Sequence, residues 1–139
     1  MSKIIIASHH KLAKGLKDTL EYILPNSIEI IPITAYVDDR SIGDLVSGVF
    51  DKIDEGEQVI AFTDIMGGSV NQEFAKRIGR ENYYLITGVN LPLLLNITLL
   101  LQNGEVDEED IRNAIEESKN QMIFVNDAMA SSNLDDEDE

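Results

Sequence analysis

Hydrophobic positions along this chain fall into short runs separated by longer stretches of helical character. Most of the short runs are apolar at consecutive positions and rich in β-branched residues, which is typical of strands buried on both faces of a parallel sheet. They predict five strands, over 3–7, 28–33, 58–62, 83–87 and 121–125. Between them, apolar stripes of helical spacing and N-terminal signals such as Ser69 as an N-cap predict helices over 11–24, 42–53, 69–78, 90–102 and 107–120.

Strands that alternate with helices of about ten to fifteen residues predict βαβ units. The fold class is therefore predicted to be α/β, with a doubly wound, mostly parallel five-stranded sheet and helices on both faces. A chain of 139 residues is one domain by size, and residues 1–125 are predicted to form it. Residues 126–139 are acidic and have little to bury, so they are predicted to be a mostly disordered tail.

Charge and composition narrow the classes of partner. The chain has 26 Asp and Glu residues against 11 Lys and Arg, a net charge of −15 with neutral histidines. Nucleic acids and anionic membrane surfaces are bound mainly through Lys and Arg, so neither is expected as a partner. Cysteine is absent, which excludes disulfides, thiolate metal sites and cysteine nucleophiles. The apolar runs are too short or too interrupted for a membrane span or a signal peptide, so a cytoplasmic protein is predicted.

Candidate functional residues follow from the rule that a doubly wound sheet binds its ligands beyond the carboxyl ends of the strands. The chain's two histidines, His9 and His10, end the first predicted strand, and Asp64 ends the third. A carboxylate beside an imidazole accepts its Nδ1–H, which leaves Nε2 unprotonated and nucleophilic. The Gly-Gly-Ser segment at 67–69 would supply free amides at a helix N-terminus, where an anion such as phosphate binds.

Together, these features predict a histidine that carries a phosphoryl group. The chain lacks the GxxxxGK[ST] and GxGxxG patterns of nucleotide sites. It also has no HExxH motif and no histidines beyond the adjacent pair. No cofactor and no metal site are therefore expected.

Three segments carry a more specific pattern: IIIASHH at the first strand, FTDIMGGSVNQ at the third and ITGVNLPLLL after the fourth. In this order and spacing, over about residues 1–125, the chain resembles the IIA protein (EIIA) of the mannose family of the bacterial phosphoenolpyruvate-dependent sugar phosphotransferase system. The resemblance implies that the phosphocarrier protein HPr donates a phosphoryl group to this chain. The chain would then pass it to a IIB component, which phosphorylates sugar entering through the membrane components IIC and IID.

The resemblance also implies roles for individual residues. The family's phosphorylated histidine falls on His9, its orienting carboxylate falls on Asp64, and its phosphate-side loop matches Gly67, Gly68 and Ser69. Members are typically homodimers whose last strand is antiparallel to the rest and exchanged between subunits, and 121–125 would be that strand. One departure is His10, where the family commonly has a small residue, often glycine; His10 could contact a partner or face solvent.

Two other functions stay open at this point. A similar domain begins the phosphotransfer subunit of dihydroxyacetone kinase, where the group goes to a kinase-bound nucleotide. The complete Gly-Gly-Ser loop and the GVNLP segment favour the mannose type over it. The domain could also be a non-catalytic regulatory or binding module, because a fold alone does not imply function. The version of that module built on an aspartate receiver is disfavoured, since the first strand here ends in histidines rather than in an acidic cluster.

Overall fold

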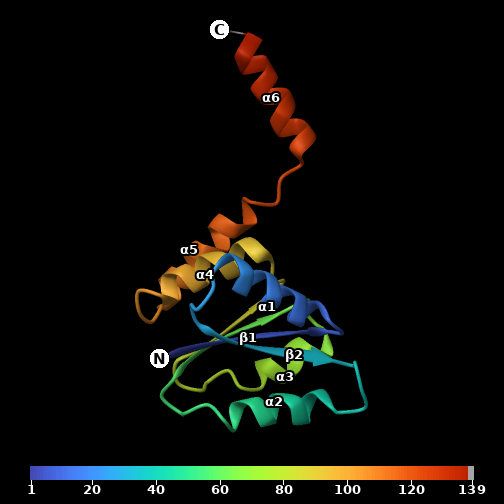
Figure 1. The fold of residues 1–139 in the computed structure, drawn as a ribbon, viewed down its shortest axis with the longest axis vertical. Coiled ribbons are helices and arrows are strands. Elements are labelled where there is room, and N and C mark those ends of the chain that lie inside the picture. The colour runs from blue at the N-terminus through green and yellow to red at the C-terminus, as the bar shows by residue number, and fades with distance from the viewer. Residues whose placement is uncertain (138–139) are drawn as a thin grey trace.

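The structure is a computed structural model that describes residues 1–137. Within this range, four parallel strands form one sheet in the order β2-β1-β3-β4 (Figure 1). The strands are β1 (Ser2–His9), β2 (Glu29–Ala35), β3 (Gln58–Thr63) and β4 (Tyr83–Thr87). The α/β class and the parallel sheet predicted from the consecutive apolar runs are confirmed.

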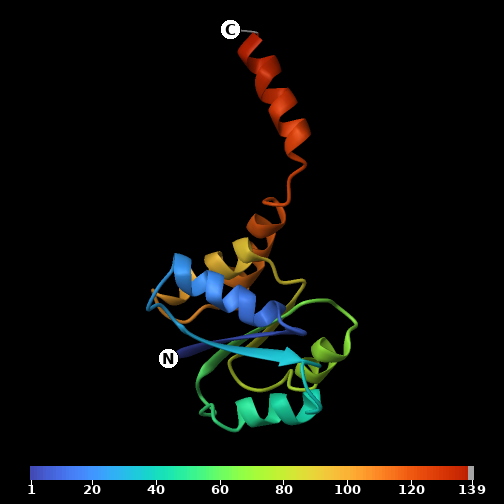
Figure 2. The same ribbon diagram turned by 45° about the vertical axis from the view of Figure 1, so that its right-hand side comes forward.

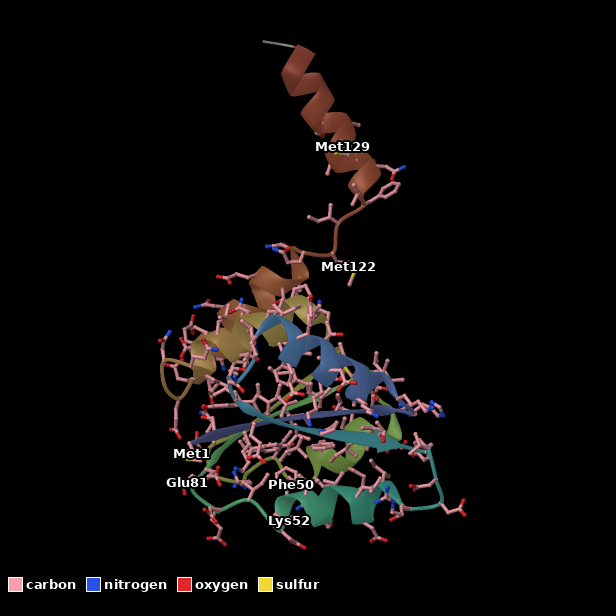
Figure 3. All side chains as sticks on the ribbon, in the orientation of Figure 1. Met1, Phe50, Lys52, Glu81, Met122 and Met129 are labelled. Atoms are coloured by element: carbon pink, nitrogen blue, oxygen red, sulfur yellow. The ribbon has the colours of Figure 1, made fainter. Side chains whose placement is uncertain are left out.

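Helices cover both faces of the sheet (Figures 1 and 2). One face packs against α1 (Leu12–Ile23), α4 (Leu91–Leu101) and α5 (Glu108–Lys119), and the other packs against α2 (Ile42–Phe50) and α3 (Ser69–Ala75). Figure 3 shows Phe50 lying between α2 and the sheet.

The middle of β1 explains why its sequence is apolar without alternation. Ile4 and Ile6 point into the core under α1, α4 and α5, whereas Ile5 and Ala7 point into the core under α2 and α3. All four side chains are fully buried. Full burial of an isoleucine is worth about 1.5–3 kcal/mol, so the strand stabilises both layers at once.

The strand register places the functional end of the sheet. His9 lies opposite Ala35 of β2, and Ala7 lies opposite Thr63 of β3. Asp64 directly follows β3, so it falls beside the last residues of β1. The loops after β1, β2 and β3 gather at the same end of the molecule (Figure 2).

The fifth strand predicted at 121–125 is not part of the sheet of the single chain, which has four strands within residues 1–137. Residues 121–124 leave the body in a turn and an extended segment, and Val125 begins α6 (Val125–Glu137). A strand needs a neighbouring sheet edge to satisfy its backbone, and this segment leads away from the sheet (Figure 1). Met122 is 83% exposed and lies on the segment between α5 and α6, beyond the body of the molecule (Figure 3). Exchange of this segment between subunits requires a second chain and stays a prediction.

The acidic tail, for which the sequence predicts mostly disorder over 126–139, is helical where the structure describes it, and its disorder stays a prediction. It forms α6 as far as Glu137, and residues 138–139 lie outside the described part. The helix projects away from the rest of the molecule (Figures 1 and 2). Local backbone hydrogen bonds, such as Asp127 N–H to Phe124 O at 3.1 Å, close its first turn, and residues 125–131 are exposed, so no apolar face of helical spacing marks this part of the helix in the sequence.

Both ends of α3 differ from the sequence pattern for local reasons. Gly68, in an extended conformation, is the N-cap of α3, and Ser69 is the first helical residue rather than the cap. The helix ends at Ala75 because the following residues tighten into turns closed by three-residue hydrogen bonds, such as Ile78 N–H to Ala75 O at 3.2 Å. None of the helices described between residues 1 and 137 has the length and apolar character needed to cross a membrane.

Candidate functional site

The ends of β1 and β3 bring His9 and Asp64 into direct contact, although 55 positions separate them in the chain. The Nδ1 atom of His9 lies 2.9 Å from Oδ2 of Asp64. The backbone N–H of His9 donates to the same oxygen at 2.8 Å, and the backbone N–H of Ile65 donates to Oδ1 at 3.0 Å. Both carboxylate oxygens are therefore held in place before any ligand arrives.

These hydrogen bonds determine the protonation state of the pair. Burial by itself would raise the pKa of Asp64, whose side chain is 11% exposed, but the hydrogen bonds from the backbone and ring of His9 and from Ile65 outweigh it and lower the pKa below its usual value. Asp64 is thus a charged acceptor at neutral pH, and it selects the tautomer of His9 with the proton on Nδ1. The lone pair of Nε2 is then free, on a side chain that is 39% exposed.

The glycine loop after Asp64 passes close against the ring of His9. Gly67 has a φ of +80°, a left-handed conformation that favours glycine. A Cβ on Gly68 would lie 3.1 Å from Cε1 of His9 and 3.3 Å from Cγ1 of Ile65. Gly68 is therefore the residue that lets the backbone reach the edge of the imidazole.

This loop leads into the N-terminus of α3, where the first amides have no helical acceptor. The first intrahelical bond is made by Gln72 N–H to Gly68 O at 3.1 Å, so the amides of 69–71 precede it. Gly68 offers no side chain to cap them. The structure thus brings together His9, Asp64 and the Gly-Gly-Ser loop, the residues that the sequence proposed as one site.

We expect Gly68→Ala to destabilise the protein by about 1–3 kcal/mol, because the added methyl group must displace His9 or Ile65. Urea unfolding of the purified variant measures the effect. Gly15→Ala is the matched control: it lies inside α1 with nothing within 4 Å of the added methyl, and it should stabilise by about 0.5–1 kcal/mol. Equal stability changes in the two variants would contradict the close approach at Gly68.

Several residues of this end of the sheet were not singled out from the sequence. Tyr36, after β2, stacks on His9 with ring centroids 5.5 Å apart and an interplanar angle of 29°. Ser8 is fully buried, and its Oγ accepts the N–H of Ala13 at 2.7 Å, which ties the end of β1 to the start of α1. The strand-end rule points to these loops, but no pattern in the sequence tells which of their side chains turn toward His9.

His10 lies outside the His9–Asp64 pair. Its backbone has a φ of +55°, and its N–H donates to Ala35 O at 2.7 Å. Glycine suits this position because it adopts the left-handed conformation without strain. A histidine here strains the backbone, but it does not change the arrangement of His9 and Asp64. His10 itself is exposed.

The site is an open surface rather than an enclosed cavity. A groove of about 600 Å³ runs between β2 and α2, and it is lined by neither His9 nor Asp64. Within the described residues, no group of three or more His, Asp or Glu side chains is placed to hold a metal ion. What the arrangement offers is one accessible imidazole nitrogen, a fixed tautomer and backbone donors at the ring edge.

The comparison with known families agrees with this geometry. The family model EIIA-man, described as the PTS system fructose IIA component, matches residues 3–115, which include His9, Asp64 and the whole glycine loop. The chain belongs to the EIIA-man family. It is thus a IIA component of the mannose family in the sugar phosphotransferase system (PTS), as the three sequence segments predicted. None of the curated proteins compared with it matches its sequence.

Solved structures of PTS proteins share the fold of this EIIA-man protein. A protein described as a phosphoenolpyruvate-dependent sugar PTS permease from Klebsiella pneumoniae subsp. pneumoniae is 30% identical, with a TM-score of 0.85 over 93% of this chain and 95% of that one. The EIIA component from Streptococcus agalactiae is 20% identical, with a TM-score of 0.76 over 91% and 98%. The mannose/sorbose-specific IIA subunit from Enterococcus faecalis is 14% identical, with a TM-score of 0.73 over 88% and 93%. The last two show likeness of fold alone.

Proposed function

We propose that this EIIA-man protein is a phosphocarrier that accepts a phosphoryl group from phospho-HPr on Nε2 of His9. It passes the group to a IIB component, which serves sugar uptake through IIC and IID in the membrane. The observation that carries the proposal is the 2.9 Å contact between Nδ1 of His9 and Oδ2 of Asp64, which leaves Nε2 as the free nitrogen of a partly exposed ring. A cytoplasmic location follows from these partners.

The transfer exchanges one phosphorus–nitrogen bond for another. The Nε2 lone pair of His9 attacks phosphorus, the bond to the donor's imidazole nitrogen breaks, and its electron pair returns to that ring. His9 then bears a positive ring that keeps its proton on Nδ1, and Asp64 stabilises the charge through that hydrogen bond. Transfer to IIB repeats the same exchange with His9 as the leaving group.

The phosphoryl oxygens need donors, and the chain offers them next to the ring. Gly67, Gly68 and Ser69 are proposed as the phosphate-binding residues, because the uncapped amides at the start of α3 lie in the loop that touches His9. These donors are important because the chain as a whole carries a net charge of −15. A dianionic group on such a chain requires a local environment that favours anions.

The surroundings of His9 support a protein as donor and acceptor. Exposed apolar side chains follow each of the three strands around it: Leu12 at the start of α1, Tyr36 and Val37 after β2, and Ile65 and Met66 after β3. Met66 is 83% exposed. Exposed apolar residues around a reactive group are typical of a protein-docking surface. The acidic surplus would steer a basic face of the partner toward it.

The direct test incubates the protein with phosphoenolpyruvate, HPr and the enzyme that charges HPr. We expect one phosphoryl group per chain that is labile in acid and stable in alkali, located by mass spectrometry under alkaline conditions. Addition of a IIB component should discharge it. Wild-type protein that takes no phosphoryl group from phospho-HPr would disprove the proposal.

We also propose that the protein is a homodimer in which 121–125 of each chain pairs with the sheet of its partner. The segment is strand-like in sequence, Ile123 and Phe124 are 57% and 66% exposed, and β4 leaves one edge of the sheet unpaired. An unpaired edge and an unpaired apolar segment are complementary in hydrogen bonding and in hydrophobicity.

The double variant Ile123→Asp/Phe124→Asp is expected to be monomeric, because it would bury two charges in the proposed interface. Light scattering coupled to gel filtration measures the mass. Tyr22→Asp is the control, since Tyr22 is an exposed apolar residue on α1, and it should leave the mass unchanged. A wild-type monomer, or a dimer that survives both aspartates, would contradict the exchange.

A further inference from the structure

Tyr36 joins three parts of the site that the fold brings to one end of the sheet. It directly follows β2, and its ring stacks on His9 at the end of β1, with centroids 5.5 Å apart. Its hydroxyl lies 2.5 Å from Oγ of Ser69, the first residue of α3. A single side chain thus contacts both the imidazole and the serine of the glycine loop.

Core packing does not explain this placement. The side chain is half exposed, and the backbone of Tyr36 has a φ of +65°, which is unfavourable for a residue with a Cβ. His10, which hydrogen-bonds to the neighbouring Ala35, is left-handed as well. Strain of this kind at a reactive site persists where the geometry it produces is useful.

The His9–Asp64 contact by itself leaves the imidazole incompletely held. A hydrogen bond at Nδ1 restrains one edge of the ring, but it permits tilting about that edge. The backbone of Gly68 passes the ring edge at Cε1, where an added Cβ would lie 3.1 Å away, and no side chain projects from that glycine to support the ring face. The stacked ring of Tyr36 supplies a face contact, so Asp64 and Tyr36 together define both the tautomer and the plane of the imidazole.

The hydroxyl of Tyr36 has a second consequence at Ser69. A hydroxyl has one hydrogen to donate and lone pairs to accept. When Tyr36 donates to Oγ of Ser69, the hydrogen of Ser69 is free to point elsewhere, toward a phosphoryl oxygen on His9. Tyr36 would therefore orient the serine as a donor while its ring orients the nucleophile.

We propose that Tyr36 is a positioning residue for the phosphoryl-accepting histidine, acting on the plane of His9 through its ring and on Ser69 through its hydroxyl. The proposal rests on the phosphocarrier function proposed above. It also has a consequence that does not depend on phosphorylation, because the stacking contact restrains the imidazole of His9 in the free protein as well.

Two variants separate the ring from the hydroxyl. Tyr36→Leu removes the stacked ring, and Tyr36→Phe keeps the ring but removes the hydroxyl. Tyr22→Leu is the matched control, since Tyr22 is 87% exposed on α1 and distant in sequence from the site. Unfolding curves establish that the variants fold. If Tyr36→Leu does not fold, Tyr36→Phe still tests the role of the hydroxyl.

The first measurement is the NMR relaxation of the Cε1–H group of His9 in the unphosphorylated protein, which reports how rigidly the imidazole ring is held. We expect the wild type, Tyr36→Phe and Tyr22→Leu to show a rigid ring. Tyr36→Leu should show a more mobile ring, with a lower order parameter at that group. An order parameter in Tyr36→Leu unchanged from the wild type would overturn the positioning role of the ring.

The second measurement is the rate of phosphoryl transfer from phospho-HPr at saturating donor. We expect Tyr36→Leu to be slower by roughly tenfold or more, because a misplaced nucleophile loses much of the advantage of orientation. Tyr36→Phe should be slower by a smaller factor, and Tyr22→Leu should match the wild type. A loss confined to the KM for phospho-HPr would make Tyr36 a partner contact and overturn the proposal. If the wild type takes no phosphoryl group, the phosphocarrier function fails, while the NMR result still decides the effect of Tyr36 on His9.

Discussion

Replacement of His9 by alanine abolishes phosphoryl acceptance, whereas replacement of the adjacent His10 by glycine preserves it: this is the largest effect we expect. The reason is that His9 alone of the two contacts Asp64 and the glycine loop. His10 uses its backbone, in a left-handed conformation, to bond to β2. Glycine accepts that conformation, so relief of strain and the greater entropy of the unfolded glycine should leave the stability of His10→Gly within about 1 kcal/mol of the wild type.

The measurement is the fraction of protein phosphorylated after incubation with phosphoenolpyruvate and the charged donor system. We expect no label in His9→Ala and full label in His10→Gly, with both variants folded by circular dichroism. Full label in His9→Ala would refute the site assignment, even though it would leave the phosphocarrier function standing. Loss of label in His10→Gly would instead move the acceptor to the second histidine.

The second large effect is expected from Asp64→Asn. Oδ2 accepts both the backbone N–H and the ring N–H of His9, and Oδ1 accepts the N–H of Ile65. An asparagine has one oxygen and one NH2 group, so each of its two orientations turns the NH2 group toward a donor of His9 or Ile65. The variant therefore stabilises the Nδ1–H tautomer less well, and it lacks the negative charge that stabilises the phosphorylated ring.

We expect the phosphorylation rate of Asp64→Asn to fall by on the order of 100- to 10,000-fold, which is the range that a positioned acid–base group contributes to catalysis. Rapid-quench labelling from phospho-HPr measures it. Asp18→Asn on α1 is the control, because Asp18 is an exposed carboxylate on the same protein and should keep the wild-type rate. A rate for Asp64→Asn within threefold or so of the wild type would show that the contact does not serve the transfer.

The same contact makes a contribution to stability that depends on pH. The pKa of Asp64 is lowered in the folded protein, so its stabilising effect is complete above the pKa of the unfolded chain and disappears as the pH falls through the lower folded value. Asp64→Asn should cost about 1–3 kcal/mol at neutral pH, because a largely buried donor loses its acceptor. The difference from the wild type should shrink in strongly acidic solution, as urea unfolding at several pH values would show.

Much of the body of the fold could be predicted from the pattern of residues. Strands such as β1 and β3 are recognisable because a central strand in this architecture buries both faces, so its side chains are apolar at every position. The helices on either side follow from stripes of helical spacing. The difference at 121–125, which is not a strand in the single chain, has the same origin, because an apolar, β-rich segment has the pattern of a strand whether or not a sheet edge of its own chain pairs with it.

Half of the site was also predictable. A parallel sheet places the carboxyl ends of its strands at one edge, so the His9–His10 pair at the end of β1 and Asp64 after β3 could be expected to lie together without knowing the structure, and the family resemblance implied that His9 is the reactive one. Tyr36 could not be found in this way. Its orientation depends on a left-handed backbone and on contacts with Ser69 and His9, and neither is encoded in local periodicity.

The amino-acid sequence by itself determined that the chain forms a parallel α/β sheet and that its chemistry lies at the ends of β1 and β3, where the two adjacent histidines and Asp64 come together, because these follow from repeating apolar patterns and from chain direction. Only the tertiary structure decided which histidine holds the carboxylate, how closely Gly68 approaches the ring and where Tyr36 stacks. These depend on angles and separations of tenths of an ångström between loops distant in the chain, which are set by packing rather than by the spacing of residues.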